Sequence, residues 1–248
     1  MRAVIYGTGK WAQLLQIKLK SFGLESILIG NNRLVATHTR YEVPHIAMSY
    51  RHLPVFIASA TKDHLADLVD SGKFYPSIIF VEKGFASSEE KEKAREWSRK
   101  RNIPICILSQ YRYSKILDVV EPFENNIVSI LHDWTLDKGL ISEWGHHLIS
   151  IDNYIKNSKN EWYVTKSGSY IIDNISTIRI GFSTIRDLKT IIKTKDETIV
   201  LNFGLTNSVH IKSNHGVDAY SCFENEDCIT SQLKDIITNT ENLRLERL

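Results

Sequence analysis

The chain has 248 residues, of which 42% are hydrophobic, and its formal net charge at pH 7 is only +2. This length suits one large domain or two small ones, and the near balance of charge argues against a basic face for nucleic acid or an acidic tail. No run approaches the roughly 18–20 apolar residues of a membrane span, and the sequence enters an apolar segment at Arg2 without a signal-peptide pattern. We therefore expect a cytoplasmic globular protein that binds neither nucleic acid nor a membrane.

Apolar and helical segments alternate in the first half of the chain. The expected strands cover residues 2–6, 26–29, 54–58, 77–81 and 103–108. The expected helices cover residues 11–22, 63–71 and 87–101. Near-continuous apolar strands joined by helices are typical of a parallel sheet that is buried on both faces. The pattern predicts an α/β fold, a doubly wound Rossmann domain over residues 1–115.

The second half has a different pattern. A helix is expected over residues 140–155 and a closing helix over residues 228–240. Between them, alternating polar and apolar residues predict strands at 162–165, 175–180, 187–194 and 198–203. Period-two alternation favours a sheet with one solvated face. We expect residues 116–248 to form a smaller α+β domain, for substrate or oligomerisation, whose sheet is mostly antiparallel.

A glycine turn follows the first expected strand. Its sequence is Gly7-Thr8-Gly9-Lys10-Trp11-Ala12, the G-x-G-x-x-A form of the dinucleotide fingerprint. The first glycine permits a tight turn, the second lets the backbone approach a diphosphate, and the small third residue lets the helix pack on the sheet. The motif alone is a weak signal, but its place between a strand and a helix strengthens it. The alternative is a tight turn that holds no ligand.

The end of the second expected strand bears on the choice of cofactor. NAD sites usually carry Asp or Glu there for the ribose hydroxyls, whereas this chain has Gly30-Asn31-Asn32-Arg33. A 2′-phosphate is attracted by a guanidinium and repelled by a carboxylate. We predict NADP rather than NAD, with Asn31, Asn32 and Arg33 at the cofactor; NAD stays possible if Arg33 is only a solvated loop charge.

Four further segments point to a family. Ala58-Ser59-Ala60 with His64 follows the third strand, and Glu82-Lys83-Gly84 follows the fourth. Gln110-Tyr111-Arg112-Tyr113 follows the fifth strand, and Glu143-Trp144-Gly145-His146-His147 lies in the expected helix of the second half. In order and spacing these segments resemble the Gfo/Idh/MocA oxidoreductases, the relatives of glucose-fructose oxidoreductase and inositol dehydrogenase, in a short form. The resemblance is good over residues 1–115 and thinner beyond.

The resemblance implies roles for particular residues. Lys83 corresponds to the lysine of the family's Glu-Lys-Pro motif, beside the nicotinamide, and is the expected proton donor or acceptor. His147 is the second expected catalytic residue, while His146 faces another direction on a helix. The expected cofactor contacts include Ala58, Ser59, His64, Glu82, Lys83 and Arg112.

The chain departs from the family pattern at two positions. Gly84 replaces the proline of the motif, and Ser150 stands where the family has an aspartate three residues after the histidine. Asp152, five residues after His147, is turned away on a regular helix and is a poor substitute. Either Lys83 handles the proton alone, or His147 works with Ser150 or a water, or catalysis is weakened.

The leading interpretation is an NAD(P)-dependent dehydrogenase or reductase that acts on a small polyhydroxylated, carbohydrate-like molecule, as the resemblance implies. One alternative is a catalytically weakened scaffold or sensor that keeps the nucleotide site. Another is an enzyme similar to dihydrodipicolinate reductase, although that family's lysine and glycine-rich motif are missing after His147. The resemblance also implies a homodimer or homotetramer.

The three cysteines Cys106, Cys222 and Cys228 are scattered through the chain. They fit a reducing compartment and form no zinc-binding pattern. We expect no metal site.

Overall fold

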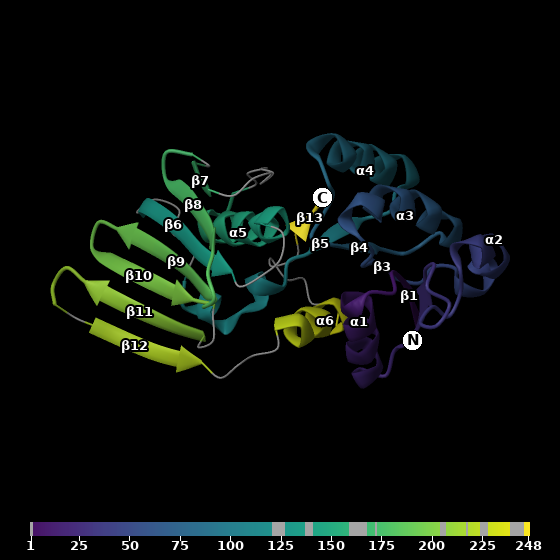
Figure 1. Cartoon of the computed structure of the whole chain (residues 1–248), viewed down its shortest axis with the longest axis horizontal. Helices are drawn as coiled ribbons and strands as arrows, with labels where there is room; N and C mark the ends of the chain where they lie inside the picture. Colours follow the sequence, from purple (N-terminus) through teal and green to yellow (C-terminus); the bar gives the residue numbers. More distant parts are fainter. Residues whose placement is uncertain are drawn as a thin grey trace. The chain divides into compact units, whose positions relative to one another are not determined.

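The computed structural model describes residues 2–120, 127–136, 141–158, 168–171, 173–203, 207–216, 218–223, 228–238 and 246–248. The chain divides into two compact units (Figure 1). The first comprises Met1–Ser109 and Thr230–Leu248, and the second comprises Gln110–Ile229. Each has its own hydrophobic core, and we describe each by itself.

The first unit is built on a mostly parallel sheet whose strands run in the order β2-β1-β3-β4-β5-β13 within the described residues. The strands are β1 (Arg2–Tyr6), β2 (Glu25–Ile29), β3 (Val55–Ile57), β4 (Ile79–Glu82), β5 (Ile105–Leu108) and β13 (Glu246–Arg247). The first five are parallel, and β3, β4 and β5 are buried throughout. They correspond to the expected strands, so the doubly wound parallel sheet is confirmed. The sequence did not indicate β13, which pairs antiparallel with β5.

Helices cover both faces of this sheet. Figure 1 shows α1 on one face and α3 and α4 on the other. The main helices are α1 (Lys10–Ser21), α3 (His64–Ser71), α4 (Ser88–Arg101) and α6 (Cys228–Thr238), and a short α2 (Val43–Ile46) precedes β3. The hydroxyl of Ser87 accepts a hydrogen bond from the backbone N–H of Glu90 and so caps the start of α4. Residues 40–50 also contain short 3₁₀ turns, which the sequence pattern did not reveal.

The second unit contains a mixed, mostly antiparallel sheet in the order β12-β11-β10-β9-β6-β8-β7. Its strands are β6 (Ile127–Leu136), β7 (Gly168–Ile171), β8 (Ser176–Phe182), β9 (Asp187–Thr194), β10 (Glu197–Asn202), β11 (Asn207–Ser213) and β12 (Asp218–Phe223). Only the β6–β8 pair is parallel among the described strand pairs of this sheet. The expected strand at 162–165 lies outside the described residues.

Helix α5 (Ile141–Lys156) packs on the inner face of this sheet. Leu148, Ile151 and Ile155 of α5 are fully buried in the same core as Ile130 and Trp134 of β6. Two 3₁₀ segments, η5 (Gln110–Tyr113) and η6 (Lys115–Val119), belong to this unit. The smaller α+β region with a mostly antiparallel sheet is therefore confirmed.

A charged network is buried between α5 and the sheet. His132 of β6 lies 2.9 Å from the Thr190 hydroxyl and 3.1 Å from the Asp152 carboxylate. The Lys156 ammonium lies 2.6 Å from the other oxygen of Asp152 and 2.5 Å from Asp173. Because an isolated buried charge is costly, this pairing is what allows Asp152 to have no exposed surface.

Among the described helices, none is long and apolar enough to cross a lipid bilayer.

Candidate cofactor-binding and catalytic site

The predicted cofactor residues of the first unit gather at one edge of the parallel sheet. Tyr6 of β1 is aligned with Ile29 of β2 and Ile57 of β3, and Ile57 is aligned with Val81 of β4. The segments that follow these strands therefore emerge at the same edge. They are the glycine turn at 7–11, the loop at 30–33, Ala58-Ser59 and Glu82-Lys83-Gly84. In doubly wound sheets, the crevice at this edge, where the strand order reverses, is where ligands bind.

Gly7 is required by close backbone packing. Its φ is +126°, and a Cβ built there would lie 2.5 Å from the carbonyl oxygen of Ala58. Its N–H donates to the Ile29 carbonyl at 2.8 Å, and the Ala58 N–H donates to the Tyr6 carbonyl at 2.8 Å. The first glycine of the motif thus closes the turn against the backbone after β3.

Gly9 leaves open space in front of α1. It is the N-cap of the helix, with φ −72°, and no side chain caps the helix or places a carboxylate in its first turn. A Cβ built at Gly9 would find no heavy atom within 4 Å. The free N–H groups and the positive end of the helix dipole suit an anion, so the residues present fit a diphosphate.

The neighbours of Gly9 add to this cradle. Lys10 is exposed, and the indole Nε1 of Trp11 is buried without a hydrogen-bond partner among the described residues. Thr8 packs against Gly30, where an added Cβ would lie 2.6 Å from the threonine methyl. Thr8 therefore packs the end of β1 against the end of β2, and this contact positions the start of the loop at 30–33.

The loop after β2 is exposed, and one of its side chains hydrogen-bonds to the backbone of the loop itself. Asn31, Asn32 and Arg33 are all exposed, and the Asn32 side-chain oxygen accepts from the Leu34 N–H at 3.1 Å. The structure also brings the Glu42 carboxylate to this loop. Hydrogen bonds from the Thr39 backbone and hydroxyl lower the pKa of Glu42, and the charges of His38 and Arg33 lower it further. Sequence reasoning missed this carboxylate because it lies nine residues beyond Arg33.

His64 ties together the loops after β3 and β4. The ring is fully buried, and its Nδ1 lies 2.5 Å from the Gly84 carbonyl oxygen while its Nε2 lies 3.0 Å from the Ser59 carbonyl oxygen. Carbonyl oxygens only accept hydrogen bonds, so a neutral ring donates to one of them at a time. His64 thus fixes the backbone beside Lys83.

Lys83 and Gly84 adopt left-handed backbone conformations, with φ of 54° and 81°. Proline is restricted to φ of about −65°, so the proline of the family motif does not fit the Gly84 conformation seen here. With glycine in place of proline, the chain therefore forms a turn that the family motif could not form at this position. The Lys83 ammonium lies 3.4 Å from the Glu82 carboxylate, with about a quarter of the lysine side chain exposed (27%).

Ser59 uses its hydroxyl within the protein. It donates to the buried carboxylate of Asp67 at 2.5 Å, and the Arg40 guanidinium contacts the same carboxylate at 2.8 Å. Burial raises the pKa of Asp67, and the Ser59 hydrogen bond and the Arg40 charge oppose the rise without cancelling it. Any contact of Ser59 with a cofactor would then come from its backbone. No local pattern indicates this Arg40–Asp67 pair, because its members lie 27 positions apart in the chain.

The remaining predicted residues lie in the second unit. His147 is almost fully buried, and its ring centroid lies 5.0 Å from that of Tyr111 and 5.8 Å from that of Trp144. The Arg112 guanidinium lies over the Tyr154 ring at 5.5 Å. The catalytic role of His147 and the cofactor contact of Arg112 stay predictions.

Asp152 does not replace the aspartate that the family pattern places at Ser150. Its carboxylate is held by His132 and Lys156 inside the unit, as described above. Ser150 is itself buried, with 2% of its surface exposed. The view that Asp152 is turned away from the side of α5 that carries His147 agrees with these contacts.

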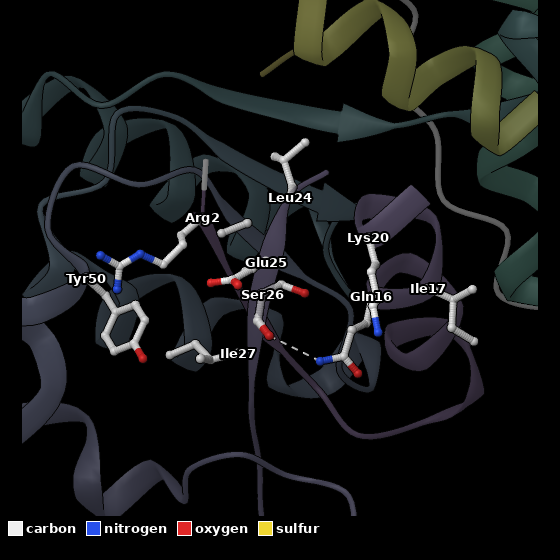
Figure 2. A pocket seen from close by; sticks show the side chains of 10 residues that line it. Arg2, Gln16, Ile17, Lys20, Leu24, Glu25, Ser26, Ile27 and Tyr50 are labelled. Atoms are coloured by element: carbon white, nitrogen blue, oxygen red, sulfur yellow. Dashed lines mark hydrogen bonds between the residues drawn. The ribbon is translucent and has the colours of Figure 1, made fainter. Parts of the chain in front are cut away.

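A pocket of about 620 Å³ lies at the opposite edge of the first sheet (Figure 2). It is lined by the amino-terminal ends of β1 and β2, by Gln16, Ile17 and Lys20 of α1, and by Tyr50. In Figure 2 the side-chain amide of Gln16 points to the Ser26 carbonyl, to which it donates a hydrogen bond of 3.2 Å. Because the glycine turn is at the carboxyl ends of the strands, this pocket is not the predicted cofactor site.

Comparison with known proteins identifies solved structures that have a similar fold. No family model matches the sequence, and no curated protein matches it. Solved structures do match. The UDP-N-acetylglucosamine 3-dehydrogenase GnnA from Acidithiobacillus ferrooxidans is 13% identical with a TM-score of 0.79, over 99% of this chain and 91% of that one.

Two other similar structures have related names. The 3-ketoreductase KijD10 from Actinomadura kijaniata, in complex with TDP-benzene and NADP, is 11% identical with a TM-score of 0.72, over 98% of this chain and 91% of that one. The dehydrogenase MviM from Clostridium difficile is 14% identical with a TM-score of 0.70, over 96% and 88% of the two chains. At these identities the likeness establishes the fold, which is the two-domain fold of the Gfo/Idh/MocA-type dehydrogenases, as the sequence resemblance indicated.

Proposed function

We propose that this protein is an NAD(P)-dependent oxidoreductase that prefers NADP and transfers hydride to or from a small polyhydroxylated, carbohydrate-like substrate. The observation that carries the proposal is the open, uncapped start of α1 at Gly9, at the sheet edge where Lys83 also lies. The structural neighbours, two named as dehydrogenases and one as a 3-ketoreductase, support it.

The residues present define how a dinucleotide would be held. The backbone N–H groups of Gly9, Lys10 and Trp11 would bind the diphosphate, and Thr8 would line the turn. Arg33, with Asn31 and Asn32, would bind the 2′-phosphate of NADP, sharing its charge with Glu42. Ala58, Ser59, His64 and Glu82 would shape the site beside Lys83. A bound nicotinamide supplies or accepts the hydride.

The protein must then hold and move a proton. Lys83 is the proposed acid or base, since its ammonium is partly exposed and its backbone is fixed by His64. His147 is the proposed partner on the substrate side, and Arg112 is a proposed cofactor contact. Ser150 offers a hydroxyl on α5 where the family has a carboxylate, so Lys83 is the main proton carrier in this proposal.

NADPH oxidation by a panel of carbonyl and imine compounds tests the proposal. Lys83→Ala should lower turnover by a factor of about 10²–10⁴, the usual contribution of a general acid or base, while the thermal unfolding midpoint is unchanged. Lys62→Ala, which removes an exposed lysine from the segment after β3, should have no such effect. Turnover that survives Lys83→Ala would remove the central assignment.

The second unit offers a face for self-association. One row of side chains crosses its sheet on the side away from α5, through Leu131, Ile191, Val200, His210 and Tyr220 in register. The first three are apolar and only partly buried, and Tyr220 is 64% exposed. A homodimer or homotetramer formed through this face would cover them.

The protein is proposed to act in the cytoplasm. Cys106, Cys222 and Cys228 form no disulfide in the structure, and Cys222 is exposed. A reducing compartment would keep them as thiols.

A further inference from the structure

Arg186 is held in place by two aromatic side chains of the second unit. It lies between β8 and β9 and is exposed. Its guanidinium carbon lies 4.8 Å from the centroid of the Trp144 ring, and its Nη2 donates to the Tyr111 hydroxyl at 2.9 Å. These contacts come from α5 and η5, so an otherwise flexible side chain is fixed at one position.

Arg186 has no acidic partner in the part of the chain that the structure describes. Its neighbour Asp187 is paired with Lys189 at 2.6 Å. A guanidinium carries five N–H donors, of which one serves Tyr111. The contact with Trp144 is a cation–π contact and not a hydrogen bond, so the guanidinium keeps donors in the paired geometry that fits a carboxylate or a phosphate.

The same two aromatic rings flank His147. Tyr111 and Trp144 lie 5.0 Å and 5.8 Å from it between ring centroids. Burial raises the pKa of Tyr111, and the charge of Arg186 only partly offsets the rise, so the hydroxyl stays protonated at neutral pH. Its oxygen accepts hydrogen bonds from Arg186 and from the Gln110 side chain, so both of these polar side chains are held at the Tyr111 hydroxyl.

Two polar atoms of this cluster are buried and unsatisfied among the described residues. They are the indole Nε1 of Trp134 and the side-chain oxygen Oε1 of Gln110. The Trp134 ring lies 5.3 Å from Tyr111 and 6.0 Å from Trp144, between centroids. Unsatisfied buried polar atoms are rare and costly, and an ordered water or a polar ligand group is what usually satisfies them.

We propose that Arg186, positioned by Trp144 and Tyr111, binds a negatively charged group of the substrate beside His147. The substrate is then an acidic carbohydrate, one that carries a carboxylate or a phosphate, rather than a neutral sugar. This inference rests on the proposed oxidoreductase function, whose substrate class it narrows.

Binding of matched sugars to the full chain tests the inference. The probes are glucose, glucuronate and glucose 6-phosphate, measured by calorimetry in the presence of NADP. At least one charged sugar should bind about tenfold or more tightly than glucose, because hydrogen bonds to charged groups are the stronger ones. The comparison of glucuronate with glucose 6-phosphate identifies the charged group.

Variants assign the effect to Arg186. Arg186→Gln should abolish the preference for the charged sugar, and Arg186→Lys should restore only part of it, because lysine lacks the paired donors. Arg179→Gln removes an exposed arginine from β8 in the same unit and should leave the preference intact. Equal affinities for glucose and both charged sugars, no binding of either charged sugar, or a preference that survives Arg186→Gln would overturn the inference.

NADP binding, measured separately in the same variants, distinguishes this inference from the proposed function. A chain that binds NADP but shows no charge preference contradicts only the inference. A chain that shows an Arg186-dependent preference without binding NADP or NADPH contradicts only the proposed function.

Discussion

The two glycines of the first turn serve different purposes, and single substitutions separate them. Gly7→Ala places a methyl 2.5 Å from the Ala58 carbonyl oxygen, at a φ of +126° that alanine rarely adopts. We expect it to destabilise the fold by about 1–3 kcal/mol or more, visible as a lower thermal unfolding midpoint.

Gly9→Ala should weaken cofactor binding and leave the stability of the fold unchanged. Its methyl enters open space at an ordinary φ, so stability should be nearly unchanged. The methyl projects where the diphosphate is proposed to lie, so NADPH affinity should fall by about tenfold or more, a loss of about 1.4 kcal/mol. If NADPH binds Gly9→Ala as tightly as the wild type, the cradle is not at this position.

Some contacts of single residues could not be predicted from the local sequence. The motif correctly indicated a glycine turn between a strand and a helix, because those requirements are local. The contacts of Glu42 with Thr39, and of Asp67 with Arg40 and Ser59, depend on how the segments between strands fold back on the sheet. The pattern of apolar residues does not predict the course of these loops.

At the scale of elements, the charged network of α5 makes the second unit sensitive to acid. Burial raises the pKa of Asp152, but the hydrogen bonds and charges of His132 and Lys156 outweigh it, and the net shift is downward. A carboxyl group whose pKa is lower in the folded state contributes stability above its unfolded pKa of about 3.9. That contribution is lost as the pH falls through the folded-state pKa.

Asp152→Asn should therefore cost about 3 kcal/mol of unfolding free energy at neutral pH, because it breaks a buried pair but leaves Asp173 on Lys156. Its stability should also change less than that of the wild type below pH ~4. Denaturant unfolding at several pH values measures both effects. Asp187→Asn, which breaks a pair with both side chains about two-fifths exposed (39% and 43%), is the control and should cost less than about 1 kcal/mol. Equal losses in the two variants would contradict the assigned role.

The sequence predicted best the strands whose side chains are buried on both faces of a sheet. The first sheet is buried on both faces, so its strands are short apolar runs and were located to within a few residues. The central strand β6 was missed because its buried and exposed residues do not alternate between apolar and polar. The polar His132 faces inward to Asp152, and Leu131 faces outward. Strand β13 is only two residues long and gives no periodic signal.

At the scale of the whole molecule, self-association through the outer face of the second sheet can be tested directly. Val200 lies in the middle of the row from Leu131 to Tyr220, between Ile191 and His210. Val200→Glu should shift the chain toward the monomer in sedimentation equilibrium, because a charge in the centre of a buried interface is costly. Lys212→Glu, near the rim of the same sheet, should shift it less. A wild-type chain that is monomeric at all concentrations would refute the proposed assembly.

The central claim is that the backbone at the start of α1 holds a dinucleotide. Titration of NADPH and NADH into the wild-type chain, followed by quenching of tryptophan fluorescence, tests it most directly. We predict saturable binding of both, tighter for NADPH, with the difference removed by Arg33→Ala. A correctly folded wild-type chain that binds neither dinucleotide would contradict the account.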